Sequence, residues 1–150
     1  METSYNHSEA AYPLEKSLDQ LWKKKLLTKD TEGHLSLYHY SKSAFQDKSS
    51  FQEDPLLIQT KSLVVDLSGN PINFPFPKTF NYKESGCPEL DLDTKVYAVE
   101  KLNGFFAQIM IDPYSKSKKL IITSSSKFLS PHVDLAKEFL KPLYPYIYKC

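Results

Sequence analysis

The stretch KSLVVDLSGNPINFPFPKTFNYKES at residues 61–85, followed at residues 96–112 by VYAVEKLNGFFAQIMID, contains most of the strand and turn signals of this chain. A short β-branched run at residues 63–67 ends in Ser-Gly-Asn at 68–70, a combination typical of a strand followed by a turn. We therefore expect a hairpin that returns through residues 72–76. Prolines interrupt this returning segment. They exclude a central strand there, because proline has no amide proton to donate.

The second stretch contains two apolar segments that pivot on Asn103 and Gly104, and a third apolar segment follows at 120–123. We expect three consecutive antiparallel strands, at 96–101, 105–111 and 120–123, because their short connections leave no room for a helical crossover. This arrangement would put Lys101 at the end of the first strand, with its side chain in a concave face.

The flanking sequence predicts a helix at each end of these strands. Leucines and one tryptophan at helical spacing predict an amphipathic helix over residues 14–27. Alternation at 35–40 predicts a strand, and the polar residues 41–55 are expected to form a loop. Ser130 and Pro131 are typical of an N-cap and first helical position, and prolines at 142 and 145 should end that second helix. The expected class is α+β, with residues 1–150 forming one domain.

Composition narrows the classes of function. The chain has 150 residues, 41% of them hydrophobic, and no apolar run approaches the roughly 20 residues of a membrane-spanning helix, so we expect a soluble, cytoplasmic protein without membrane contact. A formal net charge of +1 excludes nucleic-acid binding by bulk charge. All 19 basic residues are lysines, which cannot grip phosphate in the bidentate manner of arginine. Cys87 and Cys150 form no disulfide framework, and the scattered histidines assign no residue to a metal.

The pentapeptide EKLNG, Glu100 to Gly104, is the segment best suited to chemistry. A lysine at the junction of two apolar strands is a candidate nucleophile, since its amine can attack phosphorus. Gly104 would let a phosphate or a base approach the backbone closely. The alternative is an ordinary structural turn in which a lysine precedes a hairpin glycine.

In order and spacing, these elements resemble the adenylation domain of ATP-dependent RNA ligases of the phage type and of the fungal tRNA ligases. In that family a strand beginning with Arg-Gly precedes a Lys-x-Phe-Asn segment, and the nucleophile motif Lys-x-Asp/Asn-Gly follows. The resemblance covers about residues 56–140. The matching positions are Lys61 and Ser62 in place of Arg-Gly, then Lys78, Phe80 and Asn81, then Lys101, Asn103 and Gly104.

The resemblance implies an antiparallel-sheet nucleotidyltransferase fold, incomplete, with an N-terminal and a C-terminal helix. Residues 1–150 would be the N-terminal portion of such a domain. In the family, the carboxylate motifs and a further lysine motif follow downstream. We therefore expect that this chain does not seal RNA by itself, and that a second polypeptide is a candidate to complete the site.

The implied activity is transfer of AMP through a covalent lysyl-AMP on Lys101, formed from ATP with Mg²⁺. AMP would pass to an RNA 5′-phosphate, and an RNA 3′-hydroxyl would displace it to join the strands. The nucleotide-binding residues implied by the resemblance are Lys61, Lys78, Phe80, Glu100, Asn103 and Gly104. Among them, Lys78 would contact the phosphates, and Glu100 and Gly104 would line the adenine and ribose side.

Other interpretations remain open. Phe80 would pack near the nucleotide in the ligase interpretation, and the alternative is ordinary core packing. For Lys78, the alternative is a solvent-exposed charge in a loop. For the whole chain, the alternative function is a non-catalytic module, derived from the ligase fold, that binds nucleotide, RNA or a protein partner.

Overall fold

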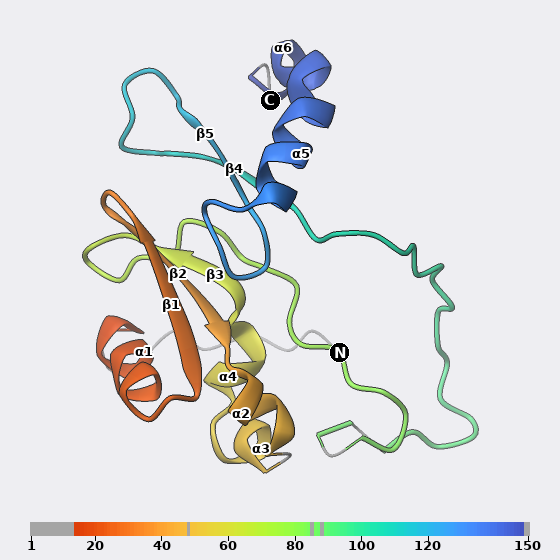
Figure 1. Cartoon of the computed structure of the whole chain (residues 1–150). Helices are drawn as coiled ribbons and strands as arrows, with labels where there is room; N and C mark the ends of the chain where they lie inside the picture. Colours follow the sequence, from red (N-terminus) through yellow and green to blue (C-terminus); the bar gives the residue numbers. More distant parts are fainter. Residues whose placement is uncertain (1–13, 48, 85, 88, 149–150) are drawn as a thin grey trace, which may run out of the picture.

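The computed structural model describes residues 14–47, 49–84, 86–87 and 89–148, and shows a mixed α/β chain with two small antiparallel sheets (Figure 1). The α+β class predicted from the sequence is therefore confirmed. The elements in chain order are α1 (Leu14–Lys23), β1 (Leu27–Glu32), β2 (Leu35–Tyr40), α2 (Lys42–Gln46), α3 (Ser50–Glu53), α4 (Leu56–Gln59), β3 (Lys61–Val65), β4 (Gln108–Ile111), β5 (Leu120–Thr123), α5 (Pro131–Leu140), the 3₁₀ turn η1 (Lys141–Leu143) and α6 (Tyr144–Ile147).

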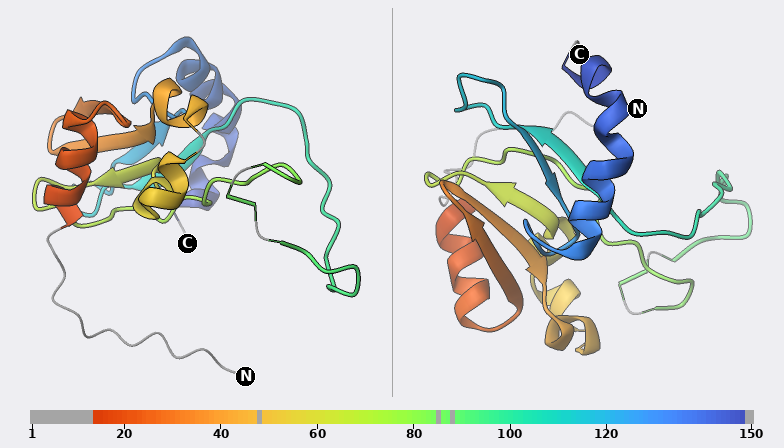
Figure 2. Two further views of the ribbon diagram at one scale, coloured as in Figure 1. Left: turned by 90° about the horizontal axis from the view of Figure 1, so that it is seen from below. Right: turned by 45° about the horizontal axis from the view of Figure 1, so that its top comes forward.

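The larger sheet has the strand order β1-β2-β3, and every neighbouring pair is antiparallel. Leu37 of β2 lies opposite Val64 of β3, but the register shifts between Tyr38 and His39, so that His39 faces Lys61. The second sheet consists of β4 and β5 alone. Helices α1 and α5 lie on opposite sides of the molecule, as the two views of Figure 2 show.

Side chains along a strand alternate between the two faces of a sheet. In the three-stranded sheet, both sets of side chains are buried against other elements. On one face Tyr38, Leu63 and Val65 pack with residues of α1, α3 and α4. On the other face Leu37 and Val64 pack with side chains of β4, β5 and the following loop, namely Met110, Ile121 and Phe128. The second core joins the two sheets.

Six of the predicted elements are confirmed: α1, β2, β3, β4, β5 and α5. Helix α5 begins as the sequence indicates, with the Ser130 hydroxyl accepting a hydrogen bond from the Val133 amide at 3.3 Å and Pro131 in the first turn. It also ends before Pro142, although the chain then continues as the short turns η1 and α6. Among the described residues, no helix is long and apolar enough to cross a membrane.

Two predictions near the N-terminus are wrong. The first helix ends at Lys23 rather than continuing to residue 27, because Leu27 begins β1, an edge strand that pairs with β2 along its whole length. Residues 41–55 contain α2 and α3 instead of a loop. The Ser41 hydroxyl caps α2 by accepting from the Ala44 amide at 3.1 Å, and Phe51 of α3 is buried in the core.

The hairpin expected after β3 forms only in part. The return segment makes one isolated bridge, between Val65 and Pro71, and no strand. The side chain of Asn73 takes the place of a neighbouring strand, since its oxygen accepts from the Val64 amide at 2.7 Å and its nitrogen donates to the Ser62 carbonyl at 3.0 Å. Prolines in this segment lack the amides that a strand would need.

The strand expected at 96–101 is absent. Residues 89–107 contain no helix or strand and run as an extended exposed segment, the long green-to-teal excursion in Figure 1. The side chains of Tyr97 and Val99 are 97% and 85% exposed. A strand needs a neighbour to satisfy its amides and carbonyls, and none of the described strands pairs with this segment.

Candidate functional site

The predicted nucleophile segment Glu100–Gly104 lies in this extended stretch, and the side chain of Lys101 is exposed to solvent. The backbone at Gly104 is equally open, because no atom lies within 4 Å of the position that a Cβ would occupy. The segment leads directly to Phe105, whose ring centroid lies 3.9 Å from that of His132 in α5. The motif is therefore tied to the folded body through this aromatic pair.

Beside the Phe105–His132 pair lies an open cavity of about 300 Å³, which we call the serine cavity. Its polar walls come from the loop between β5 and α5, and its aromatic wall comes from the segment after Gly104. The lining residues are Phe105, Phe106, Ser124, Ser125, Ser126, Lys127, Ser130 and His132. Hydroxyls, one ammonium and two phenylalanine rings offer partners for phosphate oxygens and for a base.

A tight turn shapes the polar wall. The Ser124 amide donates to the Lys127 carbonyl at 2.9 Å, and the Lys127 amide donates back to the Ser124 hydroxyl at 3.1 Å. Asp30 of β1 holds this turn from outside, because its carboxylate accepts from the Lys127 ammonium at 3.1 Å and from the Phe128 amide at 2.8 Å. The Lys127 side chain is 57% exposed, so its charge is available to solvent.

Ser62 connects the larger sheet to the same wall. It is the extra residue at the register shift between β2 and β3, and its φ of 75° lies in the left-handed region that bulges normally reserve for glycine. Its hydroxyl donates to the Ser125 carbonyl at 2.8 Å, while its own carbonyl accepts from the Gln108 side chain at 3.2 Å. One residue of β3 thus contacts both β4 and the loop at residues 124–130, which we call the serine loop.

The structure places Lys78 and Phe80 together in a different environment. The Lys78 side chain is 3% exposed, its ammonium lies 3.8 Å from the centroid of the Phe80 ring, and the rings of Phe45 and Phe51 lie nearby. The Glu84 carboxylate lies 2.9 Å from this ammonium, and that hydrogen bond lowers the pKa of Glu84. In this arrangement Lys78 is engaged inside the protein.

The remaining predicted nucleotide-binding residues fall into separate groups. Glu100, Asn103 and Gly104 are exposed on the same segment as Lys101, and Lys61 is half-buried in β3 opposite His39. Within the described ranges, no hydrogen bond or ion pair joins the 100–104 segment to Lys61 or Lys78. Burial and the Lys61 charge lower the pKa of His39 to about 4.

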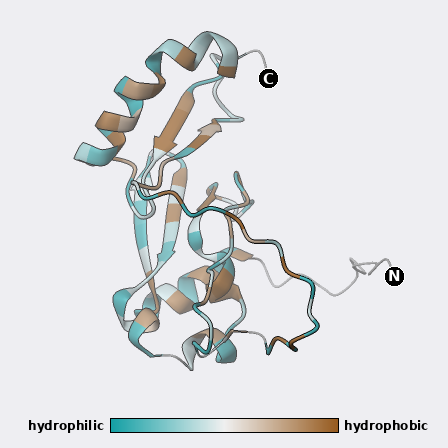
Figure 3. Cartoon of the chain, turned by 90° about the vertical axis from the view of Figure 1, so that its right-hand side faces the viewer, coloured by the Kyte–Doolittle hydropathy of each residue, from teal (hydrophilic) through white to brown (hydrophobic). Residues whose placement is uncertain are grey.

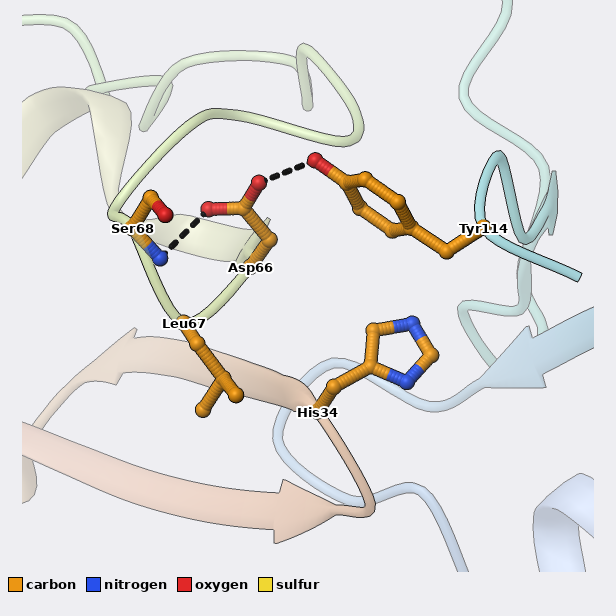
Figure 4. Close-up of a pocket in the computed structure, with 5 residues that line it drawn as sticks. All are labelled: His34, Asp66, Leu67, Ser68 and Tyr114. Carbon is orange, nitrogen blue, oxygen red and sulfur yellow. Dashed lines mark hydrogen bonds between the residues drawn. The ribbon is translucent and has the colours of Figure 1, made fainter.

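A second polar cluster, shown in Figure 4, was not expected from the sequence. It borders a cavity of about 310 Å³ lined by His34, Asp66, Leu67, Ser68 and Tyr114. The Asp66 carboxylate accepts hydrogen bonds from the Tyr114 hydroxyl, from the Ser68 amide at 2.8 Å, and from the amide and side chain of Asn70. These donors, the tyrosine first, lower the pKa of Asp66 to about 2.

A second carboxylate completes this cluster. Asp112 accepts from the Tyr114 amide at 3.0 Å and lies 3.1 Å from His34 Nε2, while the His34 and Tyr114 rings meet edge to face. The cluster joins three turns, those after β1, β3 and β4, which are distant in sequence. Because the four hydrogen bonds to Asp66 use the usual acceptor capacity of a carboxylate, we interpret the cluster as a structural link. The Asp-x-x-Gly-Asn turn was the sequence signal for Asp66.

Neither the possible metal ligands among the described residues nor comparisons with other proteins indicate a function for this site. Among the residues that the structure describes, no group of three or more His, Cys, Asp or Glu side chains is arranged to hold a metal ion. Comparisons with protein-family models, curated proteins and solved structures found no match to this chain. A function for the Lys101 segment therefore has to be argued from its motif and from the cavity beside it.

Proposed function

We propose that the chain is the N-terminal part of an RNA-ligase-like nucleotidyltransferase and that Lys101 takes AMP from ATP. The observation that carries this proposal is the position of the motif: the exposed Lys101 precedes by four residues a phenylalanine that lines the serine cavity. Four residues of extended chain span at most about 14 Å. The amine is thus tethered close to a cavity whose volume lies at the lower end of the range typical of small-molecule sites.

The proposed chemistry is nucleophilic substitution at phosphorus. The Lys101 amine, after losing a proton to water, attacks the α-phosphorus of ATP. A nitrogen–phosphorus bond forms, the bond from the α-phosphorus to the bridging oxygen breaks, and pyrophosphate leaves. An RNA 5′-phosphate oxygen then displaces the lysine and takes the AMP. Finally an RNA 3′-hydroxyl loses its proton and attacks the phosphorus of the adenylated RNA 5′-phosphate. The new phosphodiester bond joins the strands, and AMP leaves.

The serine cavity supplies the groups that such a substrate needs. The Ser126 hydroxyl can donate to phosphate oxygens, whereas the Ser124 hydroxyl already donates to the Lys127 carbonyl at 3.2 Å. The Lys127 ammonium is 57% exposed and can offset phosphate charge when it turns away from Asp30, with which it pairs at 3.1 Å. Phe105 and Phe106 offer apolar surface for the base. In this proposal Lys78 reaches phosphate only after it leaves Glu84.

The magnesium ion of the proposed reaction neutralises charge on the phosphates. At nucleotide sites Mg²⁺ is held mainly by substrate phosphates, water and one or two carboxylates. The described residues contain no larger cluster of ligands.

One observation favours the alternative of a non-catalytic module. Lys78, which would contact phosphate in the catalytic proposal, is buried and paired with Glu84. If that pair persists with nucleotide bound, the serine cavity would bind nucleotide or RNA without forming a covalent adduct.

The test is a search for the lysyl-AMP adduct. The longest natural form of the protein is incubated with ATP and Mg²⁺, and peptides are mapped by mass spectrometry. We expect AMP on the peptide containing Lys101, its loss in Lys101→Arg, and its retention in Lys95→Arg, a matched change of an exposed lysine in the same segment. An adduct on another lysine, with none on Lys101, contradicts the assignment. Nucleotide binding without any adduct supports the non-catalytic module.

A further inference from the structure

A second cavity, which we call the α5 groove, adjoins the serine cavity. It measures about 380 Å³ and is predominantly apolar, with walls from the segment entering β4 and from one face of α5. Its main apolar residues are Phe105, Ile109, Leu135, Phe139 and Leu140. Figure 3 shows the apolar positions along α5. Phe139 is 75% exposed and Phe105 67% exposed, so large hydrophobic surfaces face solvent here.

The two cavities share Phe105 and His132. The rings of this pair are tilted by 36° and stand between a wall of serine hydroxyls on one side and aliphatic side chains on the other. A ligand with a polar part and a flat apolar part, joined by a short link, would match both sides. A nucleotide has this construction, with a phosphate at one end and a base at the other.

The distribution of charged residues along the chain also favours a nucleotide as the ligand. Residues 101–148, which form both cavities, carry seven lysines against three acidic residues. The preceding residues 81–100 carry two lysines against five acidic residues. The net positive charge of this nearly neutral chain therefore lies in residues 101–148. Lys127 is the lysine that lines the serine cavity, where its ammonium is 57% exposed and pairs with Asp30 at 3.1 Å. Basic residues next to exposed aromatic rings are the usual combination for binding single-stranded nucleic acid.

We propose that the α5 groove binds an unstacked base of single-stranded RNA, with the adjoining phosphate directed toward the serine cavity. This inference rests on the proposed function and deepens it, since it assigns a binding site to the RNA strand that the reaction consumes. Phe105 provides the stacking face, and Phe139 and Leu135 enclose the base. Once pyrophosphate has left, the Ser126 hydroxyl and the Lys127 ammonium, turned away from Asp30, contact this phosphate.

The test compares two strands that differ only in their bases. Binding of a 5′-phosphorylated oligoadenylate RNA, and of an abasic strand with equal length and charge, is measured by fluorescence anisotropy on the whole chain. Stacking of one base contributes about 1 kcal/mol, so we expect the oligoadenylate to bind about fivefold more tightly. Phe105→Leu should remove this preference. Phe74→Leu, a matched change at a phenylalanine that is 89% exposed and lines neither cavity, should retain it.

Phe139→Leu provides a second variant on the exposed face of α5, and it should weaken the preference while circular dichroism shows an unchanged fold. Equal binding of the two strands by the unmodified protein would overturn the proposal. So would equal losses in Phe105→Leu and Phe74→Leu, equally tight binding of duplex RNA, or a self-association that Phe139→Leu abolishes and that RNA does not compete with.

The same variants separate this inference from the proposed function. Lys101→Arg should abolish AMP transfer and leave the preference for the base-bearing strand intact. Absence of lysyl-AMP with the preference intact would overturn only the catalytic assignment. AMP transfer to Lys101 without any preference would overturn only the α5 groove as an RNA site.

Discussion

The hydroxyl of Ser62 donates a hydrogen bond to the carbonyl oxygen of Ser125 at 2.8 Å, across 63 positions of sequence. This contact links the bulge of β3 to the wall of the serine cavity. It also explains how a serine is tolerated at a φ of 75°, in the left-handed region that favours glycine. The left-handed conformation costs a residue with a Cβ about 1–2 kcal/mol, and the hydrogen bond offsets part of that cost.

Substitution of Ser62 should separate these two effects. Ser62→Ala keeps the backbone strain and loses the hydrogen bond, so we expect a loss of about 1 kcal/mol in the free energy of unfolding. Ser62→Gly also loses the hydrogen bond but relieves the strain, and should be more stable than the alanine variant. Urea unfolding of the three proteins measures the order. An alanine variant as stable as the glycine variant would show that strain at this bulge is negligible.

Gly69 should tolerate substitution less well than Gly33. Its φ is 79°, and an added Cβ would lie 2.6 Å from Glu15 Cβ and 2.9 Å from the Glu15 amide nitrogen, at the start of α1. Gly69→Ala therefore adds a clash with helix backbone to the cost of the conformation, and we expect a loss of about 2–4 kcal/mol. Gly33→Ala is the matched control. Gly33 has a φ of 60° but no atom within 4 Å, so only about 1–2 kcal/mol should be lost. Equal thermal shifts in the two variants would contradict the predicted clash.

The buried Lys78–Glu84 pair should behave as a unit. Glu84→Gln leaves the Lys78 ammonium among three phenylalanine rings without its counter-charge, which should lower the denaturant midpoint clearly. Glu89→Gln, at an exposed position in the same connection, should have little effect.

The double variant Lys78→Met/Glu84→Gln tests whether the loss arises from the unpaired charge. Methionine fits an aromatic environment and carries no charge, so stability should recover relative to Glu84→Gln alone. A double variant less stable than Glu84→Gln would indicate that the Lys78 contacts to the rings outweigh the ion pair.

His39 should make the protein sensitive to mild acid. Burial and the neighbouring Lys61 hold the pKa of His39 at about 4, below its ordinary value of 6.5, so the fold contains the neutral ring while the unfolded chain binds a proton more readily. The stability that depends on neutral His39 is fully present above pH 6.5 and is lost as the pH falls toward 4. One such group changes the free energy of unfolding by at most about 1.4 kcal/mol per pH unit.

Replacement of His39 tests this pH dependence. His39→Gln should flatten the stability profile between pH 6.5 and 4, whereas His132→Gln, at an exposed histidine, should keep its slope. Urea midpoints at a series of pH values provide the measurement. A slope that persists in His39→Gln would assign the acid sensitivity to other groups.

Much of the secondary structure follows from local sequence. The apolar stripe of α1, the Ser130 cap with Pro131, and the β-branched runs of β3 and β5 each specify their element through spacing or through one side-chain hydrogen bond. The short helices α2 and α3 do not follow in this way. Their sequence is polar, and they form because buried side chains such as Phe51 pack into a core assembled from distant strands.

The same distinction applies to the candidate site, since one part of it follows from the local sequence and another part depends on the tertiary structure. The sequence alone determined the α+β class and singled out Lys101 through the order and spacing of its motif, since such spacing is a local property of the chain. Tertiary structure decided that Lys101 is exposed on an extended segment, that Lys78 is held by Glu84, and that Phe105 meets His132 beside the serine loop. The physical reason is that burial, ion pairing and cavity walls depend on residues distant in sequence, here joined by a second core and by the Ser62 hydrogen bond.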